Sequence, residues 1–85
     1  KSNIYILCNI SSCYRKKNSN NMAIRYLEKA KEIDDSNKLI YYNIGSIYFD
    51  MGNKKSALEN IDKALSIDGD YEEAIKLKEY INNLD

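Results

Sequence analysis

The side chains in this sequence that most readily do chemistry are its carboxylates and thiols. Two pairs of adjacent acids, Asp34–Asp35 and Glu72–Glu73, stand at expected helix starts, where the helix dipole favours negative charge. The sequence contains no histidine. The commonest general base is therefore missing, and a serine or cysteine nucleophile lacks its usual partner. We predict a protein that is not an enzyme and has no catalytic residues.

The sequence also lacks the residues needed to bind a metal ion or a phosphate group. A zinc site needs more thiols than Cys8 and Cys13 provide. The acidic segment 68–73 lacks the length and ligand order of a calcium loop, and the 3 glycines are scattered rather than gathered in a phosphate loop. The spacing of the two cysteines puts them on different faces of a helix, which excludes a bond between them. We expect no metal or cofactor, and two reduced, packed thiols in a cytoplasmic protein.

Length and composition predict a single small domain, residues 1–85. The chain has 85 residues, of which 44% are hydrophobic and 31% charged, with 13 bases balancing 13 acids. Residues 1–33 hold seven of the bases and two of the acids, a distribution that a solvated helix surface explains more simply than an acidic partner. The longest apolar run, 4–8, is too short for a membrane span. We expect neither nucleic acid nor membrane as a partner, and a first residue other than Met predicts a piece of a longer chain.

The sequence repeats itself at a fixed distance. The stretch NISSCY, residues 9–14, returns as NIGSIY at 43–48, and the agreement continues beyond it. Tyr14 and Tyr48 lie 34 residues apart, as do Ala23 and Ala57. Such self-similarity is typical of an architecture built from stacked repeats, each burying its apolar face against its neighbours.

Apolar residues recur at helical spacing, and proline is absent. We predict five helices, near 3–16, 20–33, 37–50, 54–67 and 71–83. Asn18 and Gly52 align at the breaks within the two halves, and both residue types tolerate the left-handed conformation that ends a helix. The segments 34–37 and 68–71 offer side-chain oxygens to cap the helices that follow them. Small residues at Ser11 and Gly45 would let paired helices approach closely.

These residues resemble the tetratricopeptide repeat family, whose units are antiparallel helix pairs. The family pattern of a large residue, Leu-Gly, Tyr, Ala, a bulky residue and Ala is met at the matching positions of both units: Leu7, Ile10-Ser11, Tyr14, Ala23, Leu27 and Ala30, then Tyr41, Ile44-Gly45, Tyr48, Ala57, Ile61 and Ala64. The resemblance implies an all-α, right-handed solenoid with a first repeat at 4–37, a second at 38–71 and a capping helix or partial third repeat at 72–85. The closing proline of the family is replaced by Asp35 and Gly69.

The resemblance further implies a protein-interaction module that binds a peptide or a partner helix in a concave groove lined by the first helix of each unit. Asn9 and Asn43 occupy the same place in consecutive units, and each amide could hold a peptide backbone through its donor and acceptor. Tyr42 and Phe49 could receive an apolar side chain of the partner, although such aromatics often pack on a neighbouring helix instead. The predicted peptide-binding residues are Asn9, Asn43, Ser12, Ser46, Tyr5, Leu39, Tyr42, Phe49, Arg15 and Lys16.

Three other hypotheses remain open at this stage. Family members that hold the carboxylate tail of a chaperone need bases where this chain has Leu39 and Asn43, so that clamp is incomplete here, although Arg15 or Lys16 could meet a carboxylate. The segment could instead be a structural or self-associating piece of a longer array. Helical-repeat RNA binding is disfavoured by the strict 34-residue offset and the zero net charge.

Overall fold

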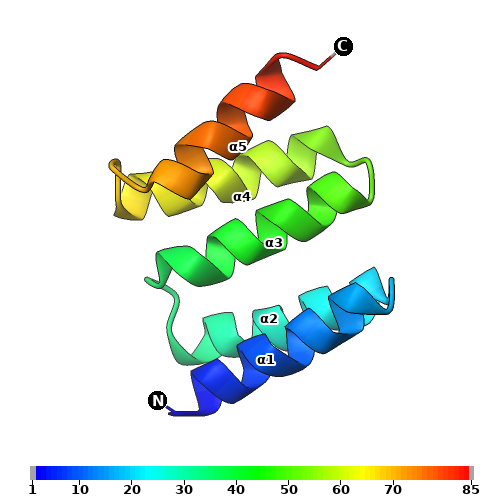
Figure 1. Ribbon diagram of the computed structural model, residues 1–85. Helices are drawn as coiled ribbons and strands as arrows, with labels where there is room; N and C mark the ends of the chain where they lie inside the picture. The colour runs from blue at the N-terminus through cyan, green and yellow to red at the C-terminus, as the bar shows by residue number, and fades with distance from the viewer. Residues whose placement is uncertain (1, 85) are drawn as a thin grey trace.

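The computed structural model describes residues 2–84 and contains five α-helices (Figure 1). They are α1 (Ser2–Lys16), α2 (Asn20–Ile33), α3 (Lys38–Asp50), α4 (Lys54–Ile67) and α5 (Glu72–Asn82). Every predicted helix is present, and each end lies within one residue of its expected position. The all-α prediction is therefore confirmed.

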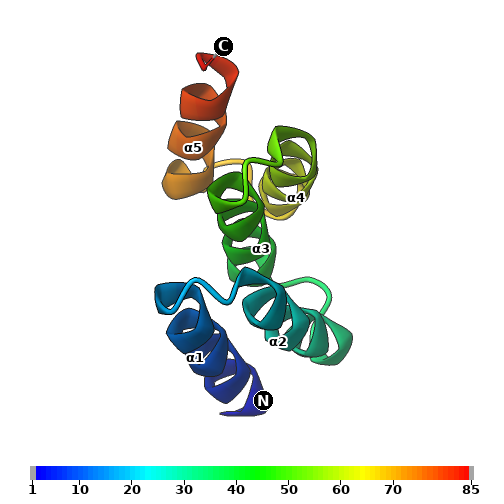
Figure 2. The same cartoon turned by 90° about the vertical axis from the view of Figure 1, so that its right-hand side faces the viewer.

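Successive helices pack as antiparallel neighbours in two layers. The principal contacts join α1 to α2, α2 to α3, α3 to α4 and α4 to α5. In Figure 2, α1, α3 and α5 lie on one side of the stack and α2 and α4 on the other, with α3 set back between α1 and α5. This arrangement places the first helix of each repeat on a common face.

The turn inside each repeat uses the same backbone conformation. Asn18 has φ 62° and Gly52 has φ 79°, both in the left-handed region, as their alignment predicts. The next residue then closes the turn, because Ser19 N donates to Tyr14 O at 2.8 Å and Asn53 N to the corresponding tyrosine oxygen at 2.9 Å. The two repeats therefore end their first helices through one shared mechanism.

Of the two side-chain caps predicted from the segments 34–37 and 68–71, the first is confirmed and the second is wrong. Asn37 accepts a hydrogen bond from Leu39 N at 3.0 Å and so caps α3. The corresponding prediction for α5 is wrong, since Tyr71 takes the N-cap position and forms no side-chain cap. Asp68 Oδ1 instead accepts from Asp70 N at 3.0 Å, which leaves its carboxylate inside the connecting turn.

Small residues let the paired helices approach closely. A Cβ atom added at Gly45 would lie 3.0 Å from the carbonyl oxygen of Ala57 and 2.9 Å from Cδ1 of Ile61. In the first repeat the aligned Ser11 is buried, and its Oγ donates to the carbonyl oxygen of Ala23 at 2.8 Å. The four alanines of the repeat pattern, Ala23, Ala30, Ala57 and Ala64, have 0% exposure. The packing role predicted for these small residues is confirmed.

One apolar face of α1 is uncovered, whereas the same face of α3 is buried. On α3, this face consists of Ile40, Ile44 and Ile47, which are 0–1% exposed and belong to one core cluster with the buried side of α2. The aligned residues of α1 are Ile6, which is 55% exposed, and the partly or fully exposed Ile10 and Cys13.

The prediction of two packed thiols is wrong for Cys13, which is exposed because no helix within residues 2–84 covers that face of α1. Cys8 is half-buried, and this burial raises the pKa of its thiol. The two thiols therefore have different surroundings although they lie on one helix.

The other end of the stack is formed by α5, whose exposed residues are mostly charged or polar, with Tyr80 as an exposed aromatic among them. Helix α5 buries Ala74 and Ile81, and it presents Glu72, Lys76 and Glu79 to solvent. This pattern is that of a helix that closes an apolar core on one side. Within residues 2–84, no helix is long and apolar enough to cross a membrane.

Candidate partner-binding face

The common face of α1 and α3 carries a stripe of side chains that is duplicated in the two repeats. On α1, Tyr5 and Asn9 lie one helical turn apart, and on α3 Leu39 and Asn43 do the same. Tyr5 is 71% exposed, Asn9 and Leu39 are also exposed, and Asn43 is half-buried. Within residues 2–84, neither asparagine amide forms a hydrogen bond with another residue of the chain. Each repeat therefore presents an apolar group followed by an amide.

Two aromatic residues of α3, Tyr42 and Phe49, pack against aromatic residues at the start of α5 and within it. The ring centroids of Tyr42 and Tyr71 are 5.3 Å apart, and those of Phe49 and Tyr80 are 5.8 Å apart with an edge-to-face geometry. Both residues therefore pack on a neighbouring helix, as the alternative interpretation of the sequence allowed, and they join the second repeat to α5. Tyr42 and Phe49 nevertheless remain partly exposed.

The bases predicted for the face are divided between an ion pair and solvent. Arg15 Nε lies 2.7 Å from Asp50 Oδ2, which ties the last turn of α1 to the last turn of α3. Lys16, the next residue, is exposed. A carboxylate that approaches Arg15 must therefore compete with Asp50.

The two serines predicted as binding residues occupy aligned positions but differ in exposure. Ser12 is exposed, but Ser46 is only 6% exposed and donates its hydroxyl proton to the carbonyl oxygen of Tyr42 at 3.0 Å. The difference arises because α3 has packed helices on both sides and α1 does not. As placed in the structure, Ser46 has no hydroxyl hydrogen left to donate to a ligand.

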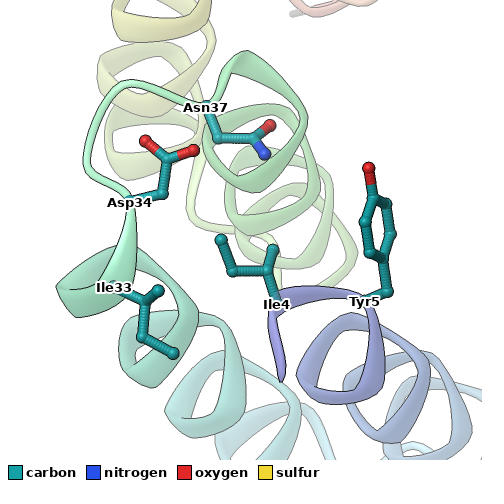
Figure 3. A pocket seen from close by; sticks show the side chains of 5 residues that line it. All are labelled: Ile4, Tyr5, Ile33, Asp34 and Asn37. Atoms are coloured by element: carbon teal, nitrogen blue, oxygen red, sulfur yellow. The ribbon is translucent and has the colours of Figure 1, made fainter. Parts of the chain in front are cut away.

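A cavity of about 530 Å³ lies at the start of α1, where α2 leads into α3. Its lining consists of Ile4, Tyr5, Ile33, Asp34 and Asn37. Figure 3 shows the carboxylate of Asp34 and the amide of Asn37 along one side, with Tyr5 across from Asp34 and Ile4 between them in this view. Only Tyr5 was predicted as a binding residue, so the other four extend the candidate site.

At the corresponding place in the second repeat, residues of the chain contact one another. The residues aligned with the lining, each 34 positions later, are Lys38, Leu39, Ile67, Asp68 and Tyr71. Lys38 Nζ forms an ion pair with Asp68 Oδ2 and lies 4.8 Å from the centroid of the Tyr71 ring.

The hydrogen bond from Lys38, with help from the backbone N–H of Asp70, holds the pKa of the Asp68 carboxyl below its ordinary value. Burial raises the pKa of Tyr71, and the nearby Glu73 adds to that effect. The difference between the two sites is visible in the sequence. At an offset of 34 residues, Ile4 of the first repeat aligns with Lys38, and Asn37 aligns with Tyr71.

Comparisons with known proteins agree with this geometry. The family model described as "Tetratricopeptide repeat" matches residues 4–37 and 39–71. The chain is also similar to DnaJ homolog subfamily C member 3 of Gallus gallus, with 26% identity over 74 residues that cover 87% of this chain and 15% of that protein. The match to the family model covers most of the chain and coincides with the two observed helix pairs. The chain therefore belongs to the tetratricopeptide repeat family.

Proposed function

We propose that this protein binds an extended segment of a partner protein across the common face of α1 and α3. Tetratricopeptide repeats are typically protein–protein interaction modules, so a protein partner is the expected ligand class. The observation that carries the proposal is the pair Asn9 and Asn43, which stand at the same position of adjacent repeats and have no hydrogen bond to other residues within 2–84.

The chemistry of the stripe suits a peptide backbone. Each amide can donate to a backbone carbonyl and accept from a backbone N–H without regard to the partner's sequence. The exposed Tyr5 and Leu39 lie one turn away and offer apolar surface to the partner's side chains. The groups therefore combine general affinity for a backbone with contacts that can select side chains.

Isothermal titration of the purified chain against a library of extended peptides tests the proposal. We expect a saturable binder whose affinity falls about fivefold or more in the double variant Asn9→Ala, Asn43→Ala, because two hydrogen bonds contribute about 0.5–1.5 kcal/mol each. The matched control is Asn21→Ala, Asn82→Ala, which removes two exposed amides from α2 and α5. The proposal fails if no peptide saturates, or if the two double variants bind equally.

A carboxylate-tail partner, as in chaperone-binding members of the family, is less well supported. Arg15 is paired with Asp50, and Lys38 is paired with Asp68. Both bases therefore have acidic partners within the chain. Lys16 remains exposed on the face, but a single solvated base contributes little to binding.

Self-association is a second candidate, and the uncovered apolar face of α1 favours it. The aligned face of α3 is buried under α2, whereas Ile6, Ile10 and Cys13 have no covering helix within residues 2–84. The exposed side of α5 at the other end carries the charged Glu72, Lys76 and Glu79, so two copies would meet α1 against α1. Such an isologous contact closes at a dimer and does not continue into a filament.

Sedimentation equilibrium distinguishes the two candidates. Self-association predicts a dimer that dissociates on dilution and is abolished by Ile6→Glu. Ile67→Glu is the control, because that side chain is also partly exposed but lies at the end of α4. A monomer at all concentrations, or a dimer that survives Ile6→Glu, contradicts the α1 contact.

A further inference from the structure

We infer that the cavity at the start of α1 binds the basic side chain, lysine or arginine, of a partner segment. The inference rests on the proposed function, since the partner lies on the stripe to which Tyr5 also belongs. Its foundation is the internal duplication of the chain, because the second repeat shows what occupies the same place when the chain supplies its own group.

In the second repeat the occupant is an ammonium group. Lys38 projects it between the carboxylate of Asp68, with which it forms an ion pair, and the ring of Tyr71, whose centroid lies 4.8 Å away. A cation is thus stabilised by a negative charge on one side and by the electron-rich face of an aromatic ring on the other. Ile67, at the end of α4, supplies apolar surface nearby.

In the first repeat the acid is retained and the cation is missing. Asp34 aligns with Asp68, but Ile4 replaces the lysine and Asn37 replaces the tyrosine. Asp34 Oδ1 accepts a hydrogen bond from Ser36 N at 3.1 Å, and within residues 2–84 the carboxylate has no basic partner. The cavity of about 530 Å³ is lined by Ile4, Asp34 and Asn37, the residues that align with Lys38, Asp68 and Tyr71.

The remaining lining matches the parts of a basic side chain. Asp34 offers the counter-charge, and Ile4 and Ile33 offer apolar contact to the methylene stem. Tyr5, across the cavity from Asp34, presents an exposed ring on which an ammonium or a guanidinium can lie. Because Tyr5 is one turn from Asn9, a peptide held by the asparagines can place one side chain in this cavity.

The test uses n-butylammonium chloride, the side chain of lysine without its backbone, and follows backbone amide shifts by NMR at low ionic strength. We expect saturable shifts at Tyr5, Asp34 and Asn37, and none of comparable size with 1-butanol, which has the same stem and no charge. Asp34→Asn should weaken the binding by up to about fivefold, the upper end of the range for an exposed charge pair. Asp35→Asn changes the net charge equally one residue away and should leave the affinity within about twofold.

A reciprocal variant tests the equivalence of the two repeats. Lys38→Ala removes the resident ammonium from a partly exposed position, so the second repeat should gain a butylammonium site with new shifts at Asp68 and Tyr71. Absence of saturable shifts in the first repeat, equal shifts with 1-butanol, or indifference to Asp34→Asn would overturn the inference. None of these experiments contains a peptide, so their failure is distinguishable from failure of the asparagine clamp.

Discussion

Ser11 and Gly45 hold the same position in the two repeats, and each faces the backbone carbonyl of an aligned alanine in a different way. Ser11 Oγ donates to the carbonyl oxygen of Ala23 at 2.8 Å. A Cβ at Gly45 would lie 3.0 Å from the carbonyl oxygen of Ala57, which is aligned with Ala23. One repeat therefore tolerates close approach by lacking a side chain, and the other uses a side chain that forms a hydrogen bond.

Gly45→Ala is expected to destabilise the protein. The new methyl group meets a backbone oxygen and the side chain of Ile61, which costs about 1–3 kcal/mol, while replacing a mid-helix glycine recovers about 1 kcal/mol. We expect a net loss of up to about 2 kcal/mol, measured by urea unfolding. The control is Gly69→Ala, where the added atom meets only Leu65 O at an ordinary 3.8 Å and should not destabilise. Equal effects at the two glycines would show that the helix contact at Gly45 is not tight.

Ser11→Ala is expected to cost about 0.5–1.5 kcal/mol, because it removes the buried hydrogen bond to Ala23 and adds no cavity of note. Ser12→Ala, on the adjacent exposed position, should change the free energy of unfolding by less than about 0.5 kcal/mol. Chemical denaturation of both variants measures the difference. If Ser12→Ala proved the more costly change, the hydrogen bond would not be a source of stability.

The ion pair between Lys38 and Asp68 predicts a dependence on pH. The pKa of Asp68 is lower in the folded than in the unfolded chain, whose ordinary value is about 3.9. Its contribution is therefore present above that value and is lost as the pH falls through the folded pKa. An NMR titration of the side-chain carboxyl carbon should give a midpoint below the ordinary value, and Lys38→Ala should raise it. A normal midpoint in the unaltered protein would contradict the pairing.

The two thiols are expected to react at different rates. Cys13 is exposed, whereas burial raises the pKa of Cys8 and lowers the fraction present as thiolate. Ellman's reagent should give a fast phase that is absent in Cys13→Ser and a slow phase that is absent in Cys8→Ser. In urea the two phases should merge, because the difference depends on the fold. A single phase in the native protein would exclude the proposed difference in environment.

The helices and their core were predictable because the residues that determine them act locally or recur in both repeats. Asn18 and Gly52 stop helices through their own backbone preferences, and the alanines recur wherever two helices must approach. These features depend on the residue and its close neighbours in the chain. They are therefore the same in both repeats.

The surface was less predictable because it depends on which helices lie next to each repeat. Ser12 and Ser46 are aligned, yet one is exposed and the other is buried, since only α3 has packed neighbours on both sides. Cys13 was expected to be packed but is exposed, whereas Ile47, its counterpart in the second repeat, is buried. The cavity beside Asp34 was missed because it results from residues that the first repeat lacks, and a search for shared residues does not detect them.

The principal helix contacts join each helix to the next, and α1 at the end of the stack has one extensively packed neighbour, α2, besides the Arg15–Asp50 ion pair to α3. A terminal helix with few packed neighbours can open locally while the rest of the stack stays folded. Amide hydrogens of α1 should thus exchange with deuterated solvent well before those of α3. A partner segment bound to both Asn9 and Asn43 would link α1 to the more protected α3. Binding should therefore slow the hydrogen exchange of α1.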